Sequence, residues 1–335
     1  MTISGIGLPP GRVLELEGGY VFPNTVVEPW LEVGEEVFSN VTRLRPDNDA
    51  PDRPPRPVAR WLLCAGFRSL EPIDLKFVHT YLERVALPLR LGTPGTVLLD
   101  ALRVQKAEVT DFIPHSSNSA APEPYGLNTF VDLSERECRG METIALPQLS
   151  YRPAYELALM HFSVARKTIA PAEMCLELLV ALETMFDPDN DARGRGDRVA
   201  RRASAFAGTN VEQVRTFRKL LRQGYEHRNT LRHGERDALK TEAAKQWFQV
   251  HVMDLTVIAA WSFQRVLALA AADSSFDLDS HISQVDAGND RALTALRATR
   301  LFWATKVRGG SNLDLRHFES SGASSVEFIP LVDDG

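Results

Sequence analysis

Residues 225–234 hold the densest group of side chains that could act on a phosphodiester. The stretch reads Tyr-Glu-His-Arg-Asn-Thr-Leu-Arg-His-Gly. Arginine can direct two N–H donors at a phosphate and keeps its charge, and histidine can accept or donate a proton near neutral pH. Together they supply the proton acceptor, proton donor and cation that cleavage of RNA by its own 2′-hydroxyl requires. Because DNA lacks that hydroxyl, such a site without a metal ion would favour RNA.

The order of residues in this stretch resembles the HEPN superfamily and, within it, the Apea-like HEPN branch. The mark of that family is an arginine, a polar residue, a short spacer and a histidine. The likeness covers about residues 150–272. It is carried by the motif Arg228-Asn229-Thr-Leu-Arg-His233, by Tyr225 and Gly234 on either side, by the earlier segment Leu178-Leu-Val-Ala-Leu-Glu183, and by Arg201-Arg202-Ala203.

The resemblance implies a metal-independent endoribonuclease that works without a cofactor and leaves a 2′,3′-cyclic phosphate. It also implies a homodimer, formed through the helical bundle, in which two motifs line one cleft. If the family roles apply to this chain, His233 would transfer protons and Arg228 would hold the scissile phosphate. Asn229 would orient one of these two side chains. An antiviral (phage) defence nuclease or a regulated toxin, with a regulatory partner protein, would suit this activity.

Neighbouring side chains would complete the site. Glu183 stands on an otherwise apolar helical segment, where an unpaired carboxylate would be costly, so we expect it to pair with Arg202 or Arg228. Glu183 and Arg202 would thus have a structural role beside the site and would not transfer protons. The side chains predicted to contact RNA are Arg222, Tyr225, His227 and Arg232.

A second register of the motif runs from Arg222 to His227. We reject it because Gln223, rather than Asn, Asp or His, follows its arginine, and because the family glycine follows only His233. Positions five apart on an ideal helix lie ~140° apart around the axis. The chosen motif therefore needs a helix end or break between Arg228 and His233.

Two competing interpretations involve no cleavage. In the first, His233 caps a helix and Arg228 forms a surface ion pair with Glu226 or Glu235, an interaction of little energetic value. In the second, the HEPN fold is kept but serves as a non-catalytic scaffold for RNA or nucleotide binding or for dimerisation.

Metal ions and membranes are not expected as partners. The segment Asp187–Asp191 is followed by Ala192 and Arg198 where a calcium loop needs glycine and glutamate. The net charge of −6 excludes a basic coat over the whole protein, so any RNA contact must be local. Residues 255–272 are interrupted by polar side chains and are interpreted as a core helix. With three scattered cysteines, a cytoplasmic location is expected.

The sequence predicts an α+β protein in three parts. A β-containing domain at 1–140 precedes an all-α bundle at 150–272, and a basic helix and tail follow at 273–335. The first part, with alternation at 13–17 and β-branched residues at 96–109, is expected to sense or regulate. One helix is expected within 72–91, and another at 290–307. The bundle helices are predicted at 154–168, 172–186, 198–206, 211–227 and 235–272.

Overall fold

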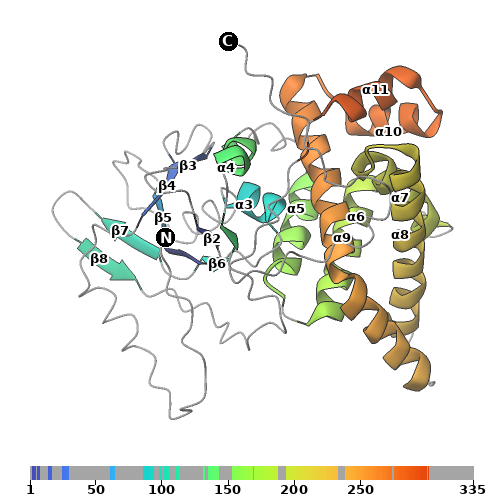
Figure 1. The fold of residues 1–335 in the computed structure, drawn as a ribbon, viewed down its shortest axis with the longest axis horizontal. Coiled ribbons are helices and arrows are strands. Elements are labelled where there is room, and N and C mark those ends of the chain that lie inside the picture. The colour runs from blue at the N-terminus through green and yellow to red at the C-terminus, as the bar shows by residue number, and fades with distance from the viewer. Residues whose placement is uncertain are drawn as a thin grey trace.

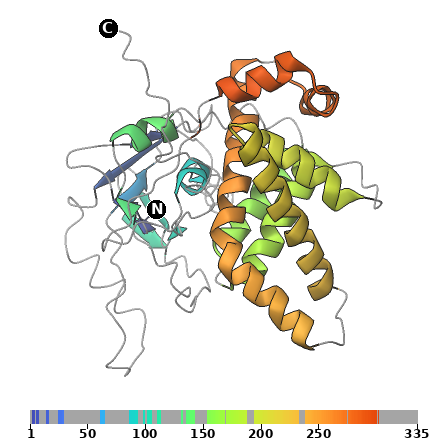
Figure 2. The same cartoon turned by 45° about the vertical axis from the view of Figure 1, so that its right-hand side comes forward.

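The computed structural model describes residues 86–93, 135–142, 153–168, 170–187, 194–232, 238–273, 275–299 and 301, together with the backbone of short strands between residues 2 and 132. The helical part is a bundle around one long central helix, with two short helices across one end (Figures 1 and 2). The helices are α3 (Leu87–Gly92), α4 (Glu135–Glu142), α5 (Pro153–Ala165), α6 (Pro171–Phe186), α7 (Arg195–Ala207), α8 (Val211–Arg232), α9 (Ala238–Ala272), α10 (Leu278–Asp286) and α11 (Asp290–Ala298).

The predicted α+β class is wrong: the part of the chain whose side chains are described is all-α. Among residues whose side chains are described, 86% are helical and none lies in a strand. Every buried member of the apolar core belongs to a helix, from Leu87 in α3 to Leu296 in α11. Because the core decides the class, short strands that add no described side chain to it do not make the protein α+β.

Nine short strands are described by their backbone. They are β1 (Thr2–Ser4), β2 (Ile6–Gly7), β3 (Leu14–Leu16), β4 (Thr25–Pro29), β5 (Trp61–Cys64), β6 (Leu98–Leu99), β7 (Leu102–Gln105), β8 (Thr110–Ile113) and β9 (Val131–Asp132). An antiparallel sheet has the order β3-β4-β5-β1-β6, β7 pairs antiparallel with β8, and β2 pairs parallel with β9. β3 lies in the predicted alternation at 13–17, and β6 and β7 lie in the β-branched segment at 96–109.

Proline and glycine residues set the helix boundaries of the bundle. α6 begins at Pro171, whose fixed φ suits a first helical position. α7 starts after Gly194, which has a φ of 65°, and ends at Gly208. A Cβ on Gly208 would lie 2.4 Å from Val214 Cγ2, so only glycine lets α7 and α8 approach this closely. The predicted helices at 154–168 and 172–186 are confirmed, whereas α8 runs five residues past its predicted end at 227.

The central helix α9 carries the middle of the core. Its half from Leu255 to Leu267 is buried almost continuously, and it packs against α6, α7 and α8. By length and composition α9 is one described helix that could cross a membrane, but 78% of its most apolar window is buried inside the protein. That burial matches the interpretation of residues 255–272 as a core helix.

The bundle also includes residues from outside the range 150–272. Leu87 and Leu91 of α3 belong to the apolar core, and Gln264 Nε2 of α9 donates to the carbonyl of Leu91 at 2.9 Å. α10 and α11 pack against the end of the bundle through Leu278 and Leu296. The predicted helix at 72–91 is described only from residue 86 on. The one predicted at 290–307 is too long, because α11 ends at Ala298 and Thr299 after it is extended; residues 302–307 lie outside the described residues.

Candidate functional site on helices α8 and α9

The motif arginine lies inside the bundle rather than on its surface. Arg228 is 6% exposed and directs Nη1 and Nη2 at the two carboxylate oxygens of Glu183 on α6, with Nη2 to Oε2 at 2.8 Å. The prediction that Glu183 pairs with an arginine is thus confirmed, and the partner is Arg228. A forked pair of this kind fixes both geometry and charge. It ties the last third of α8 to α6, and its carboxylate neutralises the cation predicted to hold a phosphate.

Tyr225 is also buried and completes this contact. Its hydroxyl donates to the carbonyl of Leu179 at 3.2 Å, and the Arg228 guanidinium lies 5.7 Å from the ring centroid. Burial, followed by the nearby Glu183 carboxylate, raises the pKa of Tyr225 well above its usual range. A Cβ on Gly196 of α7 would meet the Tyr225 ring at 3.0 Å. The side chain therefore joins three helices and does not lie on the outer surface of α8.

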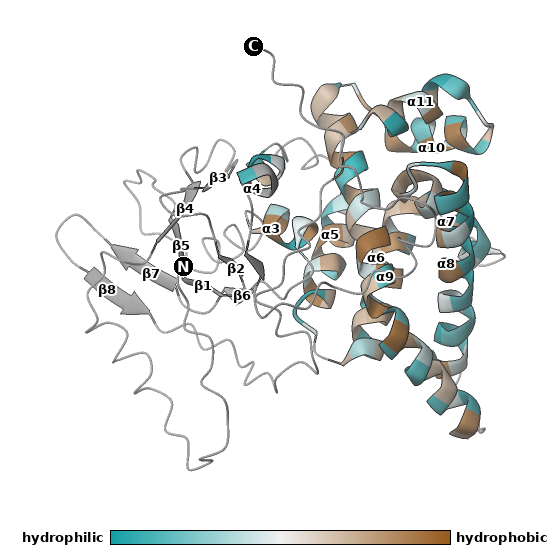
Figure 3. Ribbon diagram, in the orientation of Figure 1, coloured by the Kyte–Doolittle hydropathy of each residue, from teal (hydrophilic) through white to brown (hydrophobic). Residues whose placement is uncertain are grey.

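The outer surface of α8 is strongly basic. Exposed residues recur every three or four positions along the whole helix, as one face of an α-helix requires. This α8 basic face has four cations and two carboxylates and comprises Glu212, Arg215, Lys219, Arg222, Glu226, Asn229 and Arg232. Figure 3 shows the hydrophilic outer surface of α7 and α8 against their apolar inner side. From Glu212 to Arg232 the face runs over about 30 Å.

α8 runs without a break through the first part of the motif. It is described to Arg232, and the side chains of Asn229 and Arg232 are exposed. His233 lies outside the described residues, so its predicted role stays a prediction. The structure brings Asn229 and Arg232 together on the surface in the last turn before the histidine, while Arg228 turns inward.

Arg202 pairs with Asp286 and not with Glu183, which was one of the two predicted pairings. Its Nε donates to Asp286 at 2.9 Å and its Nη1 to the carbonyl of Phe186 at 2.6 Å. Asp187, at the end of α6, accepts from Arg198 at 3.0 Å through both oxygens and also lies near Arg202. Arg202 thus joins α7 to α6 and α10, and Glu183 is left to Arg228. Asp187, the first residue of the segment Asp187–Asp191, is therefore buried in ion pairs, and residues 188–193 lie outside the described residues.

A ring cluster lies in the flank between α8 and α9. Of its members, His227 was predicted to contact RNA, whereas Trp247 and His251 were not predicted from the sequence. His227 of α8 lies against Trp247 of α9 with ring centroids 4.9 Å apart, and Trp247 lies 4.5 Å from His251. His251 Nδ1 is 2.9 Å from Asp254 Oδ2, so the imidazole donates to a carboxylate that is 6% exposed. The spacing Trp247, His251, Asp254, at four and three residues, was the available signal for one face of α9.

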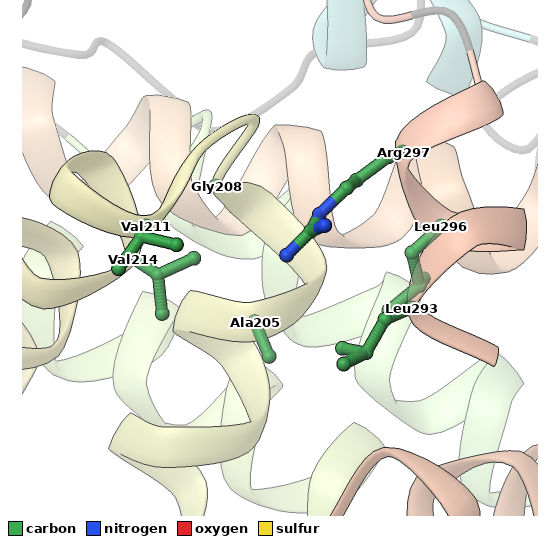
Figure 4. Close-up of a pocket in the computed structure, with 7 residues that line it drawn as sticks. All are labelled: Ala205, Gly208, Val211, Val214, Leu293, Leu296 and Arg297. Atoms are coloured by element: carbon green, nitrogen blue, oxygen red, sulfur yellow. The ribbon is translucent and has the colours of Figure 1, made fainter. Parts of the chain in front are cut away.

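No cluster of metal ligands accompanies these groups in the part of the chain that the structure describes, since no three His, Cys, Asp or Glu side chains gather there as metal ligands would. An apolar pocket lies at the opposite end of α8, between α7, α8 and α11, and Arg297 reaches into it (Figure 4). It is lined by Ala205, Gly208, Val211, Val214, Leu293, Leu296 and Arg297. It shares no residue with the α8 basic face or the ring cluster.

Comparison with known proteins adds no relative. No family model, curated protein or solved structure matches the chain.

Proposed function

We propose that this protein binds RNA along the α8 basic face. The observation that carries the proposal is the concentration of exposed charge: the α8 basic face holds four cations and two carboxylates in a chain whose net charge is −6. A local basic surface on an acidic protein directs polyanions to one place, which is the electrostatic pattern of nucleic-acid binding. The likeness to HEPN proteins favours RNA as the polyanion.

Reversing three charges on this face is expected to abolish RNA binding. In Arg215→Glu, Lys219→Glu, Arg222→Glu, affinity for a single-stranded RNA should fall at least about 100-fold at low salt, because three phosphate contacts become repulsive. The slope of log Kd against log salt should become shallower by about 2, since each lost contact releases ~0.7 counterion fewer. Fluorescence anisotropy across a salt series measures both.

A matched control separates this face from net charge. The triple variant Arg139→Glu, Arg291→Glu, Arg297→Glu changes the charge by the same amount at exposed arginines of α4 and α11. Its affinity for RNA should stay within about threefold of the wild type, because these arginines are not expected to contact phosphates. Equal losses in both triple variants would show that only overall charge matters and would refute the α8 basic face as the RNA surface.

The second candidate function is metal-independent cleavage of the bound RNA. It is favoured by exposed Asn229 and Arg232 in the last turn of α8, directly before His233. In this proposal Arg232 meets the phosphate, Asn229 orients it and His233 moves the proton. Arg228, held by Glu183, is a positioning residue that fixes the end of α8. Such an enzyme would act in the cytoplasm, under a regulatory partner, in defence or as a toxin.

We also propose that a second copy of the chain packs against α5. Leu157, Met160 and Val164 are exposed on one face of α5, at spacings of three and four residues. Exposed Glu156 lies at one end of this stripe and exposed Lys167 just beyond the other. When the stripe packs antiparallel against its own copy, apolar side chains face each other and each glutamate comes opposite a lysine. This self-complementarity is what a two-fold interface requires.

Introducing a charge into the stripe is expected to dissociate the homodimer. Met160→Glu buries a carboxylate at the axis, so the dimer Kd should rise at least about tenfold, which corresponds to 1.4 kcal/mol. Glu156→Lys should weaken the dimer, and Glu156→Lys with Lys167→Glu should restore it. Light scattering coupled to size exclusion reports the mass, and Val250→Glu, an exposed apolar site on α9, is the control. A monomeric wild type, or a charge swap without recovery, would refute this interface.

A further inference from the structure

We infer that the ring cluster of His227, Trp247 and His251 is a binding site for an unpaired nucleobase. The inference rests on the proposed RNA binding and adds a second kind of contact to it. The α8 basic face supplies phosphate contacts, which position a nucleic acid but do not hold its bases. A base needs a flat ring at the surface, and the ring cluster supplies one beside the basic face.

The three rings lie at the edge of the core. His227, Trp247 and His251 are each partly exposed, whereas Phe248, the next residue on α9, is fully buried. Trp247 packs against the core with part of its side chain. The remainder of its indole and parts of the two imidazoles stay accessible to a ligand.

The rings contact one another at tilted angles. The His227 and Trp247 planes differ by 30° and the Trp247 and His251 planes by 41°, whereas Phe248 meets Trp247 edge-on at 77°. A nucleobase packs on an aromatic side chain by offset stacking, which tolerates any base because each has a flat face. The accessible part of this ring cluster offers such a surface in the free protein.

The cluster is held in place before any ligand arrives. Asp254, largely buried, fixes the His251 ring through Nδ1. Burial lowers the pKa of His227 below its ordinary value, although the Glu226 carboxylate partly opposes this shift, and the neutral form of the ring is thereby favoured. A preorganised surface binds at a smaller entropic cost than one that must order itself.

The position of His227 links the ring cluster to the basic face. It lies eight residues after Lys219 on the same helix, which places it about 80° around the axis and 12 Å along it. Gln223 and Thr230, both partly exposed, occupy the strip between the basic face and the rings. An RNA strand with its phosphates on the outer face of α8 can therefore turn a base into the flank between α8 and α9.

The test compares single-stranded RNA with a duplex of the same length. Trp247→Ala should lower affinity for the single strand about tenfold and leave duplex affinity unchanged, because paired bases are not available for stacking. Trp247→Phe keeps a ring and should stay within about threefold of the wild type. Val250→Ala, at an exposed site of the same helix, should change neither affinity. Far-ultraviolet circular dichroism checks the helical content of each variant.

The outcomes separate this site from the proposed function. If the α8 charge reversal removes binding while Trp247→Ala affects both RNA forms equally or neither, RNA binding stands and the base site is refuted. If the wild type binds no RNA, both fail. Should Trp247→Ala not fold, photocrosslinking of the wild type to a 5-iodouridine oligonucleotide replaces it. A crosslinked peptide containing Trp247 or His227 supports the site, and crosslinks confined to other peptides overturn it.

Discussion

Replacing Glu183 by methionine is expected to lower the free energy of unfolding by about 3–5 kcal/mol, because one partner of a buried ion pair is lost. Arg228 would stay 6% exposed without the carboxylate that holds both of its terminal nitrogens. An uncompensated buried guanidinium cannot escape by losing its proton. Urea unfolding followed by circular dichroism measures the loss, with an unchanged m-value as the sign that the unfolding transition is the same.

The double variant Glu183→Met, Arg228→Leu isolates the cause of that loss. Apolar residues of similar volume often replace a buried ion pair without loss, so it should lie within about 1.5 kcal/mol of the wild type. The matched control is Glu177→Met on the same helix, where a half-buried carboxylate pairs with His161 at 2.8 Å. That change should cost less than about 1 kcal/mol. A double variant as unstable as Glu183→Met alone would contradict a dominant role for the ion pair.

Helix positions in the bundle follow from local chemistry, and so they could be predicted. Pro171 starts a helix because its φ is fixed near the helical value, and Gly208 follows the end of one because it has no Cβ. The end of α8 could not be predicted in this way. Residues 228–232 carry no strong breaker, and the helix continues through them while Arg228 is anchored from α6.

The fold class was predicted incorrectly because strand patterns say nothing about the size of the core. The alternation around Leu14 does form a strand, but only of three residues. In contrast, α3 lies in the part assigned to a β-containing domain, yet Leu91 is in the helical core and its carbonyl binds Gln264. Such a contact joins residues 173 positions apart, beyond the range of any local pattern.

In the candidate site, residue types were predictable but their directions were not. A continuous helix turns Arg228 about 120° away from Arg222, so one arginine is buried and the other exposed. The need of Glu183 for an arginine followed from its apolar surroundings and is confirmed. The ring cluster joins His227 to residues 20 and 24 positions later, and only the packing of α8 on α9 brings them together.

Replacing His233 by alanine is expected to slow RNA cleavage by about 10²–10⁴-fold, the usual contribution of a positioned proton-transfer group. Arg232→Ala should weaken cleavage more than it weakens RNA binding, because its contact is placed at the reacting phosphate. The assay uses end-labelled single-stranded RNA in EDTA, and cyclic-phosphate ends identify 2′-hydroxyl attack. A wild type that binds RNA but does not cut it would contradict cleavage and leave binding as the function.

The same assay decides what Arg228 does, provided that it is applied to a variant that folds. Arg228→Ala alone leaves Glu183 buried without a partner, so a loss of cleavage there would only reflect instability. The double variant Glu183→Met, Arg228→Leu removes the guanidinium without that penalty, and because Arg228 is buried we expect it to keep cleavage within about tenfold of the wild type. A fully folded double variant with unchanged RNA affinity but no cleavage would instead place the Arg228 guanidinium on the scissile phosphate, after release from Glu183.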